Sequence, residues 1–163
     1  MIVKTKKYKI DPDIYVKISF VNALKEWWWV WFIPPAIFLI FLAFGLWGWG
    51  LGVSIVLSGL YLLFWYIQFK GLTMHEKSKP LFDKYAYDIN SQRIMMMVDA
   101  KRGSEIKWDK IIKVEKREDA FVLYLSKFEF LYFPFNIFKS ENEIKFVETV
   151  IRRKGYLNTE IKK

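Results

Sequence analysis

The chain contains no cysteine and a single histidine, His75. The missing thiols exclude disulfide bonds and thiolate chemistry, and they are typical of a domain that faces the cytosol. One histidine cannot build a metal site or a catalytic triad without distant partners. We therefore expect no metal site, no cofactor and no catalytic residue that the sequence alone can identify.

The sequence also lacks the motifs that mark common catalytic and nucleotide-binding sites. It has no Walker-type loop, no G-x-G-x-x-G, no H-E-x-x-H and no G-x-S-x-G. Glu115, Glu118 and Asp119 cluster beside basic residues, but at an expected turn they indicate a solvated tip. We expect a protein that is not an enzyme, with an enzyme whose site forms only in three dimensions as an alternative.

Charge is missing altogether from residues 27–69, which contain no Lys, Arg, Asp, Glu or His. One membrane span needs about 20 apolar residues, so this run predicts a transmembrane hairpin with spans at about 29–44 and 53–69. Coupled transporters usually place ionisable residues at membrane depth. Because neither span has one, we interpret the hairpin as an anchor.

Glycine and proline predict the shape of this hairpin. The glycine-rich segment 45–52 is expected to form the turn between the spans. Pro34 and Pro35 remove two backbone donors, so a kink is expected near the start of the first span. Ser54 and Ser58 form a weak small-xxx-small pattern that favours close approach of the second span to the first or to a neighbouring protomer.

Tryptophans stand at both ends of the predicted spans. Indole rings collect at headgroup depth, so these residues are predicted to be interfacial anchors. They are Trp27, Trp28, Trp29 and Trp31 at the cytoplasmic entry, and Trp47 and Trp49 at the outer turn. An aromatic ligand box is the alternative for the first cluster, but no charge or acceptor lies nearby in the sequence.

The net charge of +9 is concentrated on both sides of the hairpin. Residues 1–26 hold six lysines and three acids, and residues 70–163 hold twenty Lys and Arg and fourteen acids. The positive-inside rule then places both termini in the cytoplasm. Lys70, Lys77 and Lys79 are candidates for contact with anionic lipid, although ordinary topology charge explains them equally well. We expect no nucleic-acid partner.

Residues 1–26 are charged and show no cleavable signal. Residues 2–10 are predicted to form a strand that joins the cytoplasmic sheet, with a basic membrane-facing arm as the alternative. Asp11 and Pro12 then predict the start of a juxtamembrane amphipathic helix, with a stripe of apolar residues along one face. The members of that stripe are Ile14, Ile18, Val21 and Leu24.

Residues 70–163 are predicted to form a cytoplasmic domain. Short segments of period two predict strands at 84–89, 93–98, 104–108, 111–116, 120–126 and 129–133. Of the consecutive Met95, Met96 and Met97, one or two should face the core, with a Met-rich recognition surface as the alternative. Ser140 and Glu143 predict a capping box at the start of a C-terminal helix, residues 141–154.

This layout resembles the YcxB-like family of small bacterial membrane proteins. The resemblance lies in the segment 106–115 around Trp108, in Phe121–Leu125, and in Phe133–Pro134 leading into the Ser140 helix. It implies a pleckstrin-homology-like (PH-like) cytoplasmic domain, a bent sheet or partial barrel capped by a helix. The family has no settled activity, so the resemblance concerns the fold rather than the function.

The expected fold class is therefore an α+β membrane protein, with a two-helix transmembrane hairpin and a PH-like small β-barrel or bent sheet capped by a C-terminal helix. The expected location is the bacterial cytoplasmic (inner) membrane. The favoured function is a non-catalytic binding or regulatory module at the inner leaflet. Its partners would be membrane lipids and a protein, or a second copy of itself. An immunity or stress-protection protein is the other alternative.

Overall fold

The computed structural model describes residues 1–99 and 102–156 and shows an α+β chain with two antiparallel sheets. The chain divides into two compact units. One consists of Met1–Ile10 together with Phe82–Lys163, and the other is Asp11–Leu81. The first unit is thus built from residues on both sides of the second, so the second unit is an insertion in its sequence.

The inserted unit is helical. Its elements are α1 (Pro12–Glu26), the 3-10 helix η1 (Trp28–Phe32), α2 (Ile33–Ala43) and α3 (Trp47–Met74), and the 3-10 helix η2 (Glu76–Phe82) follows. Asp11 caps α1 by accepting a hydrogen bond of 2.8 Å from the amide of Asp13, as its sequence predicts. The predicted stripe on α1 is wrong except at Ile18, because the helix buries Tyr15, Val16, Ser19 and Ala23 instead.

The bend in the helical unit lies at Trp27, where α1 and the η1–α2 segment meet at 65°. The predicted kink at the two prolines is therefore wrong. Pro34 and Pro35 occupy the first turn of α2. At this position an α-helix has no use for their missing N–H groups, so the prolines start the helix and do not bend it.

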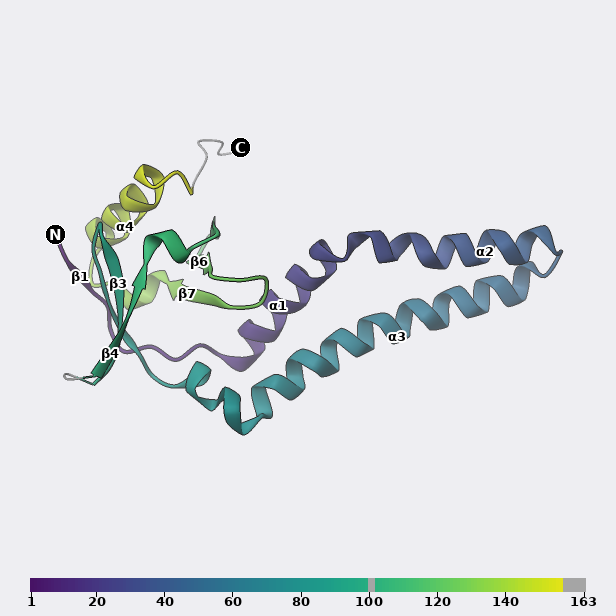
Figure 1. Cartoon of the computed structure of the whole chain (residues 1–163), viewed down its shortest axis with the longest axis horizontal. Helices are drawn as coiled ribbons and strands as arrows, with labels where there is room; N and C mark the ends of the chain where they lie inside the picture. Colours follow the sequence, from purple (N-terminus) through teal and green to yellow (C-terminus); the bar gives the residue numbers. More distant parts are fainter. Residues whose placement is uncertain (100–101, 157–163) are drawn as a thin grey trace. The chain divides into compact units, whose positions relative to one another are not determined.

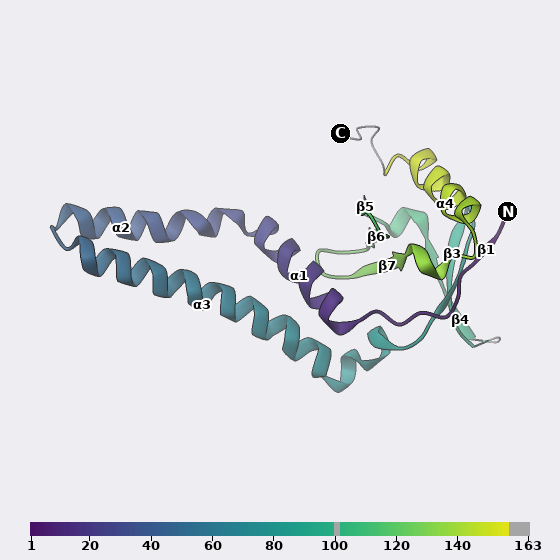
Figure 2. The ribbon, with the colours of Figure 1, turned by 180° about the vertical axis from the view of Figure 1, so that it is seen from behind.

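α2 and α3 run side by side in opposite directions (Figures 1 and 2). The turn between them is Phe44–Leu46, with Gly45 at a φ of 74°, so the predicted turn over 45–52 is too long. Gly48, Gly50 and Gly52 continue as helix, since helical hydrogen bonds satisfy backbone groups that a glycine loop would leave open. The second helix accordingly begins six residues before the predicted span, which starts at Val53.

Gly50 sets the spacing of the helix pair. A Cβ atom at Gly50 would lie 2.6 Å from the Cβ of Phe41, so only glycine fits there. Ser54 Oγ donates to the carbonyl of Pro34 across the pair at 2.9 Å, and Ser58 Oγ donates to Ser54 within α3. The predicted close approach of the two helices is thus made by Gly50 and Ser54.

One helix, Trp47–Met74, is long and apolar enough to cross a membrane. The bent pair Pro12–Glu26 and Trp28–Ala43 passes the same test only when its two parts are counted together. Length and composition are thus compatible with one span or two.

The α+β unit contains both sheets in the described part of the chain. The first has the order β1 (Val3–Lys4), β2 (Ala86–Ile89), β3 (Arg93–Asp99), β4 (Arg102–Lys107), and the second has the order β5 (Lys113–Lys116), β6 (Ala120–Tyr124), β7 (Phe130–Pro134). The strands therefore do not close into a single barrel. Trp108, expected in a strand, lies in the 3-10 helix η3 (Trp108–Lys110).

The N-terminal strand joins the first sheet, which confirms that prediction. Val3 lies opposite Ile89 and Lys4 opposite Asp88, and an isolated bridge pairs Tyr8 with Tyr85. The regular strand is only two residues long, shorter than the predicted 2–10.

The core of this unit lies between the two sheets and α4 (Glu141–Arg153), drawn in yellow in Figure 1. Tyr87 of the first sheet meets Phe133 of the second edge to face, with ring centres 4.8 Å apart. From α4, Val147, Val150 and Ile151 enter the same core. Every residue of the central strand β6 is buried, as its continuous apolar run indicates.

Two local predictions in this unit concern the three consecutive methionines and the start of α4. Of the three methionines, Met96 packs against the core, so the prediction that at least one faces inward is confirmed. α4 begins at Glu141 as predicted, but the capping box is wrong: Ser140 makes no side-chain cap, and the Glu143 carboxylate accepts from the amide of Lys139 at 2.7 Å. The amide of Glu143 already donates to the Ser140 carbonyl, which leaves the hydroxyl without that partner.

Candidate functional site

The tryptophans predicted at the cytoplasmic entry lie together in the structure. Trp28, Trp29 and Trp31 are in η1, and Trp27 is at the bend before it. The ring of Trp27 lies 6.2 Å from that of Trp29 and 6.3 Å from that of Trp65 on α3. All four predicted anchors are exposed, so their indole surfaces are available to a surrounding medium.

Trp47 and Trp49 lie at the other end of the helix pair, in the first turn of α3. Their side chains are 65% and 73% exposed. The structure therefore places the six predicted anchors in two groups at opposite ends of the helix pair.

Two of the three lysines proposed for lipid contact, Lys70 and Lys79, have described side chains, and these have separate acidic partners. Lys70 Nζ lies 2.8 Å from the Asp13 carboxylate and connects α3 to α1. Lys79 in η2 lies 3.2 Å from Glu76, and both side chains are exposed. The side chain of Lys77 lies outside the described residues. Of the two described lysines, Lys79 is the more accessible.

A small pocket of about 100 Å³ lies within the helical unit. Its lining is mostly apolar: Val30, Trp31, Ile33, Pro34, Leu57, Ser58 and Tyr61. The Tyr61 hydroxyl is buried and has no hydrogen-bond partner in the described part of the chain. The pocket has room for a few water-sized molecules and for nothing as large as a cofactor.

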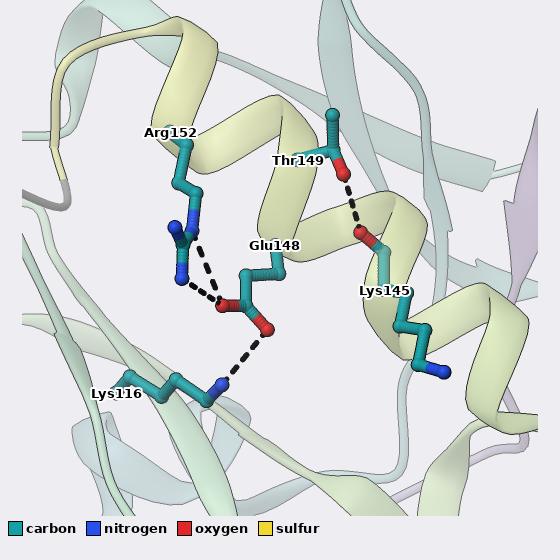
Figure 3. Close-up of polar contacts among 5 residues, drawn as sticks. All are labelled: Lys116, Lys145, Glu148, Thr149 and Arg152. Atoms are coloured by element: carbon teal, nitrogen blue, oxygen red, sulfur yellow. Dashed lines mark hydrogen bonds and ion pairs between the residues drawn. The ribbon is translucent and has the colours of Figure 1, made fainter. Parts of the chain in front are cut away.

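A cluster of charged residues connects α4 to β5 (Figure 3). The Glu148 carboxylate lies 2.8 Å from Lys116 Nζ and 2.7 Å from the Arg152 guanidinium. The hydrogen bond from Lys116, assisted by that from Arg152, lowers the pKa of Glu148. The cluster thus holds Glu148 charged and fixes one face of α4 on the second sheet.

Two tyrosines bond to the predicted solvated tip. Tyr124 donates to Glu115 at 3.1 Å, and Tyr132 donates to Asp119 at 3.3 Å. Burial, with the nearby carboxylates, raises the pKa of each phenol to about 12. Both phenols therefore stay protonated at neutral pH. Within residues 1–99 and 102–156, no three His, Cys, Asp or Glu side chains gather where a metal ion could be held.

A groove of about 560 Å³ lies beside the C-terminal half of α4. It is lined by Met1, Ser91, Phe146, Thr149, Val150, Arg153 and Lys154. Arg153 and Lys154 lie at the end of the predicted C-terminal helix, and the sequence did not predict a groove there. The apolar spacing of α4 shows which of its residues face the core. Ser91, however, comes from the β2–β3 turn, and only the folded structure brings it next to α4.

The family comparison concerns the α+β unit. The YcxB-like protein family model matches residues 89–151. The resemblance seen in the sequence is therefore confirmed. No curated protein and no solved structure gives a significant match to the chain.

The YcxB-like segment starts at Ile89, the last residue of β2, and ends at Ile151 in α4. It includes Trp108, Pro134 and the charged pair of Lys116 and Glu148. The helical unit, Asp11–Leu81, lies outside the match. The family match thus covers the strands from β3 to β7 and most of α4.

Proposed function

We propose that this protein is a membrane-anchored binding module without catalytic activity of its own. In this proposal α2 and α3 cross a bacterial inner membrane as a hairpin, and the α+β unit is a PH-like domain that acts at the cytoplasmic leaflet. The observation that carries it is the pairing of Val3 with Ile89, which closes the α+β unit across the inserted helices.

This pairing supports an even number of crossings. Because β1 precedes the helical unit and β2 follows it, both ends of that unit must lie on the same side of any membrane. A helix of 28 residues, at 1.5 Å per residue, is about 42 Å long and exceeds a hydrocarbon core of about 30 Å. In chain order, η1 and α2 would supply the first crossing, and α3 would supply the second.

Charge supports the orientation. The turn Phe44–Leu46 carries no charge, whereas Lys and Arg are abundant before residue 27 and after residue 69. The positive-inside rule then favours a cytoplasmic α+β unit and an outer turn. Each of the two described lysines pairs with one acid, and Lys79 is the better candidate for lipid contact because its side chain is 69% exposed, against 34% for Lys70.

The arrangement of the α+β unit supports the PH-like interpretation. Two small antiparallel sheets enclose the core, and a C-terminal helix packs on it. β4 is an edge strand, and most of its residues are exposed. Such an edge is suited to pairing with a strand from a protein partner or from a second copy of the chain.

The orientation is tested with single cysteines, because the chain has none of its own. Leu46→Cys places a thiol in the turn, and Glu118→Cys places one at the exposed tip of the α+β unit. In intact cells, a membrane-impermeant maleimide should label the first variant, and the second only after lysis. Equal labelling of both variants in intact cells would contradict the proposed topology.

Binding is tested by crosslinking in native membranes. A photo-reactive residue at Ser104 on the edge strand β4 should capture a defined partner or a second copy of the chain. The same residue at Asn142, exposed on α4, serves as the matched control. If neither position captures a partner, and the purified protein neither self-associates nor prefers anionic liposomes, the binding function is wrong.

A further inference from the structure

The groove beside α4 is lined by two cationic side chains and by apolar side chains. Arg153 and Lys154 supply the charge, and Met1 and Phe146 supply accessible apolar surface. Ser91 and Thr149 add two hydroxyl groups. None of the residues that line it carries a carboxylate side chain.

The two cations are available. In the described part of the chain, neither Arg153 nor Lys154 forms an ion pair or a side-chain hydrogen bond, and both side chains are exposed. Arg152, by contrast, is held by Glu148 on another face of the helix (Figure 3). Neighbouring basic residues of one helix end therefore have different surroundings.

The side chains of Arg153 and Lys154 are not needed to cap the C-terminal end of α4. Backbone amides already satisfy three carbonyls of the last turn of α4: Lys154 donates to Val150, Gly155 to Arg152, and Tyr156 to Ile151. Gly155 adopts a φ of 80°, as such a helix end requires. The helix dipole places only about half a negative charge here, so two full positive charges leave the site attractive to anions.

We propose that this groove binds the headgroup of an anionic phospholipid. Arg153 and Lys154 would contact the phosphate, with the Ser91 hydroxyl as a further donor, and Phe146 would contact the glycerol and the first acyl carbons. Charge complementarity argues for the phosphate, and the apolar surface with the volume of about 560 Å³ argues for an amphiphile over a bare ion. This inference rests on the proposed function in one respect, because the membrane supplies the lipid.

The test uses the full chain in a neutral maltoside detergent and short-chain phosphatidylglycerol as the probe. Isothermal titration calorimetry should show saturable binding, and the double variant R153Q/K154Q should weaken it about tenfold or more. K139Q/K145Q is the matched control, because it removes the same charge from exposed lysines that do not line the groove. Circular dichroism checks that both variants fold.

The binding of the two double variants and of the different lipids decides whether the groove binds an anionic phospholipid. Weaker binding in R153Q/K154Q with unchanged binding in the control supports it. Equal loss in both double variants, or equal binding of short-chain phosphatidylcholine, overturns it, because either result shows that the groove does not select the anion. Equal binding of glycerol phosphate overturns the lipid as the source.

The proposed function is tested separately. A chain that shows the proposed labelling pattern and captures a partner, but does not bind phosphatidylglycerol, loses only the groove assignment. A chain that binds phosphatidylglycerol through Arg153 and Lys154 but labels equally at both cysteines loses only the proposed topology.

Discussion

The indole Nε1 of Trp108 donates a hydrogen bond of 2.8 Å to the backbone carbonyl of Asn90. The carbonyl of Trp108 in turn accepts a hydrogen bond of 2.7 Å from the Tyr156 hydroxyl. With 1% of its surface exposed, Trp108 connects the β2–β3 turn to the residues that follow α4. This one residue therefore connects the start of the YcxB-like segment to the chain that follows its end.

Replacement of Trp108 by Phe should destabilise the α+β unit by about 2 kcal/mol, because it leaves a cavity and removes the bond to Asn90. Thermal unfolding followed by near-ultraviolet circular dichroism measures this loss. Tyr156→Phe removes one hydroxyl and keeps the ring, so it should cost about 1 kcal/mol. A Trp108→Phe protein as stable as the parent would show that the connection is not needed.

The N-terminal strand is predicted to stabilise the unit that it joins. Val3 is fully buried, so Val3→Asp places a carboxylate in the core and should cost about 3 kcal/mol or more. Ile2 is 60% exposed, and Ile2→Asp should change stability little. Both are measured by chemical denaturation in detergent. Similar losses in the two variants would argue against a specific role for β1.

Packing of the helix pair is predicted to depend on Gly50. Gly50→Ala places a methyl group against Phe41 and should destabilise the pair by about 1–3 kcal/mol. Gly59 on the same helix faces open space, so Gly59→Ala should have no such effect. Unfolding in dodecyl sulfate, followed by tryptophan fluorescence, compares the two variants. Equal unfolding midpoints for the two variants would show that the helix pair does not depend on the contact between Gly50 and Phe41.

Stability is predicted to fall at alkaline pH. The folded protein raises the pKa of Tyr124 and Tyr132 from 10.0 to about 12, mainly by burial. Their contribution is fully present below pH 10 and is lost as the pH rises to about 12, because the unfolded chain releases its phenolic protons first. Denaturation at stepped alkaline pH measures this slope. A Tyr124→Phe/Tyr132→Phe variant should show a smaller fall, and an identical slope would refute the assignment.

The strands were the most predictable part of the fold. β2 to β7 lie close to the predicted segments, because alternating apolar residues and turn residues such as Asn90 indicate them locally. The pairing of β1 was predictable for another reason: a hairpin of two spans, as predicted, would return the chain to the side of the membrane from which it started. The start of α4 at Glu141 was also predictable, although its cap was not, because an amide such as that of Glu143 has several acceptors within reach.

Features that depend on tertiary packing were not predictable from sequence. The length of the turn at Gly45 was overestimated. Gly48, Gly50 and Gly52 suggest a loop unless the contact of Gly50 with Phe41 is known. The split into two sheets was missed, since strand patterns do not state which strands pair. The groove requires Ser91 and Arg153 to lie near each other, although most of the YcxB-like segment separates them in the sequence.

The insertion of the hairpin between β1 and β2 has a consequence for biosynthesis. β1 is made first, but its partner appears only after residues 11–85 have been translated, which takes roughly 4–15 s at about 5–20 residues per second. In the proposed topology, a chain whose second helix fails to insert keeps Val3 and β2 on opposite sides of the bilayer. Its α+β unit would stay incomplete and open to proteolysis, so completion of the fold would itself report correct insertion.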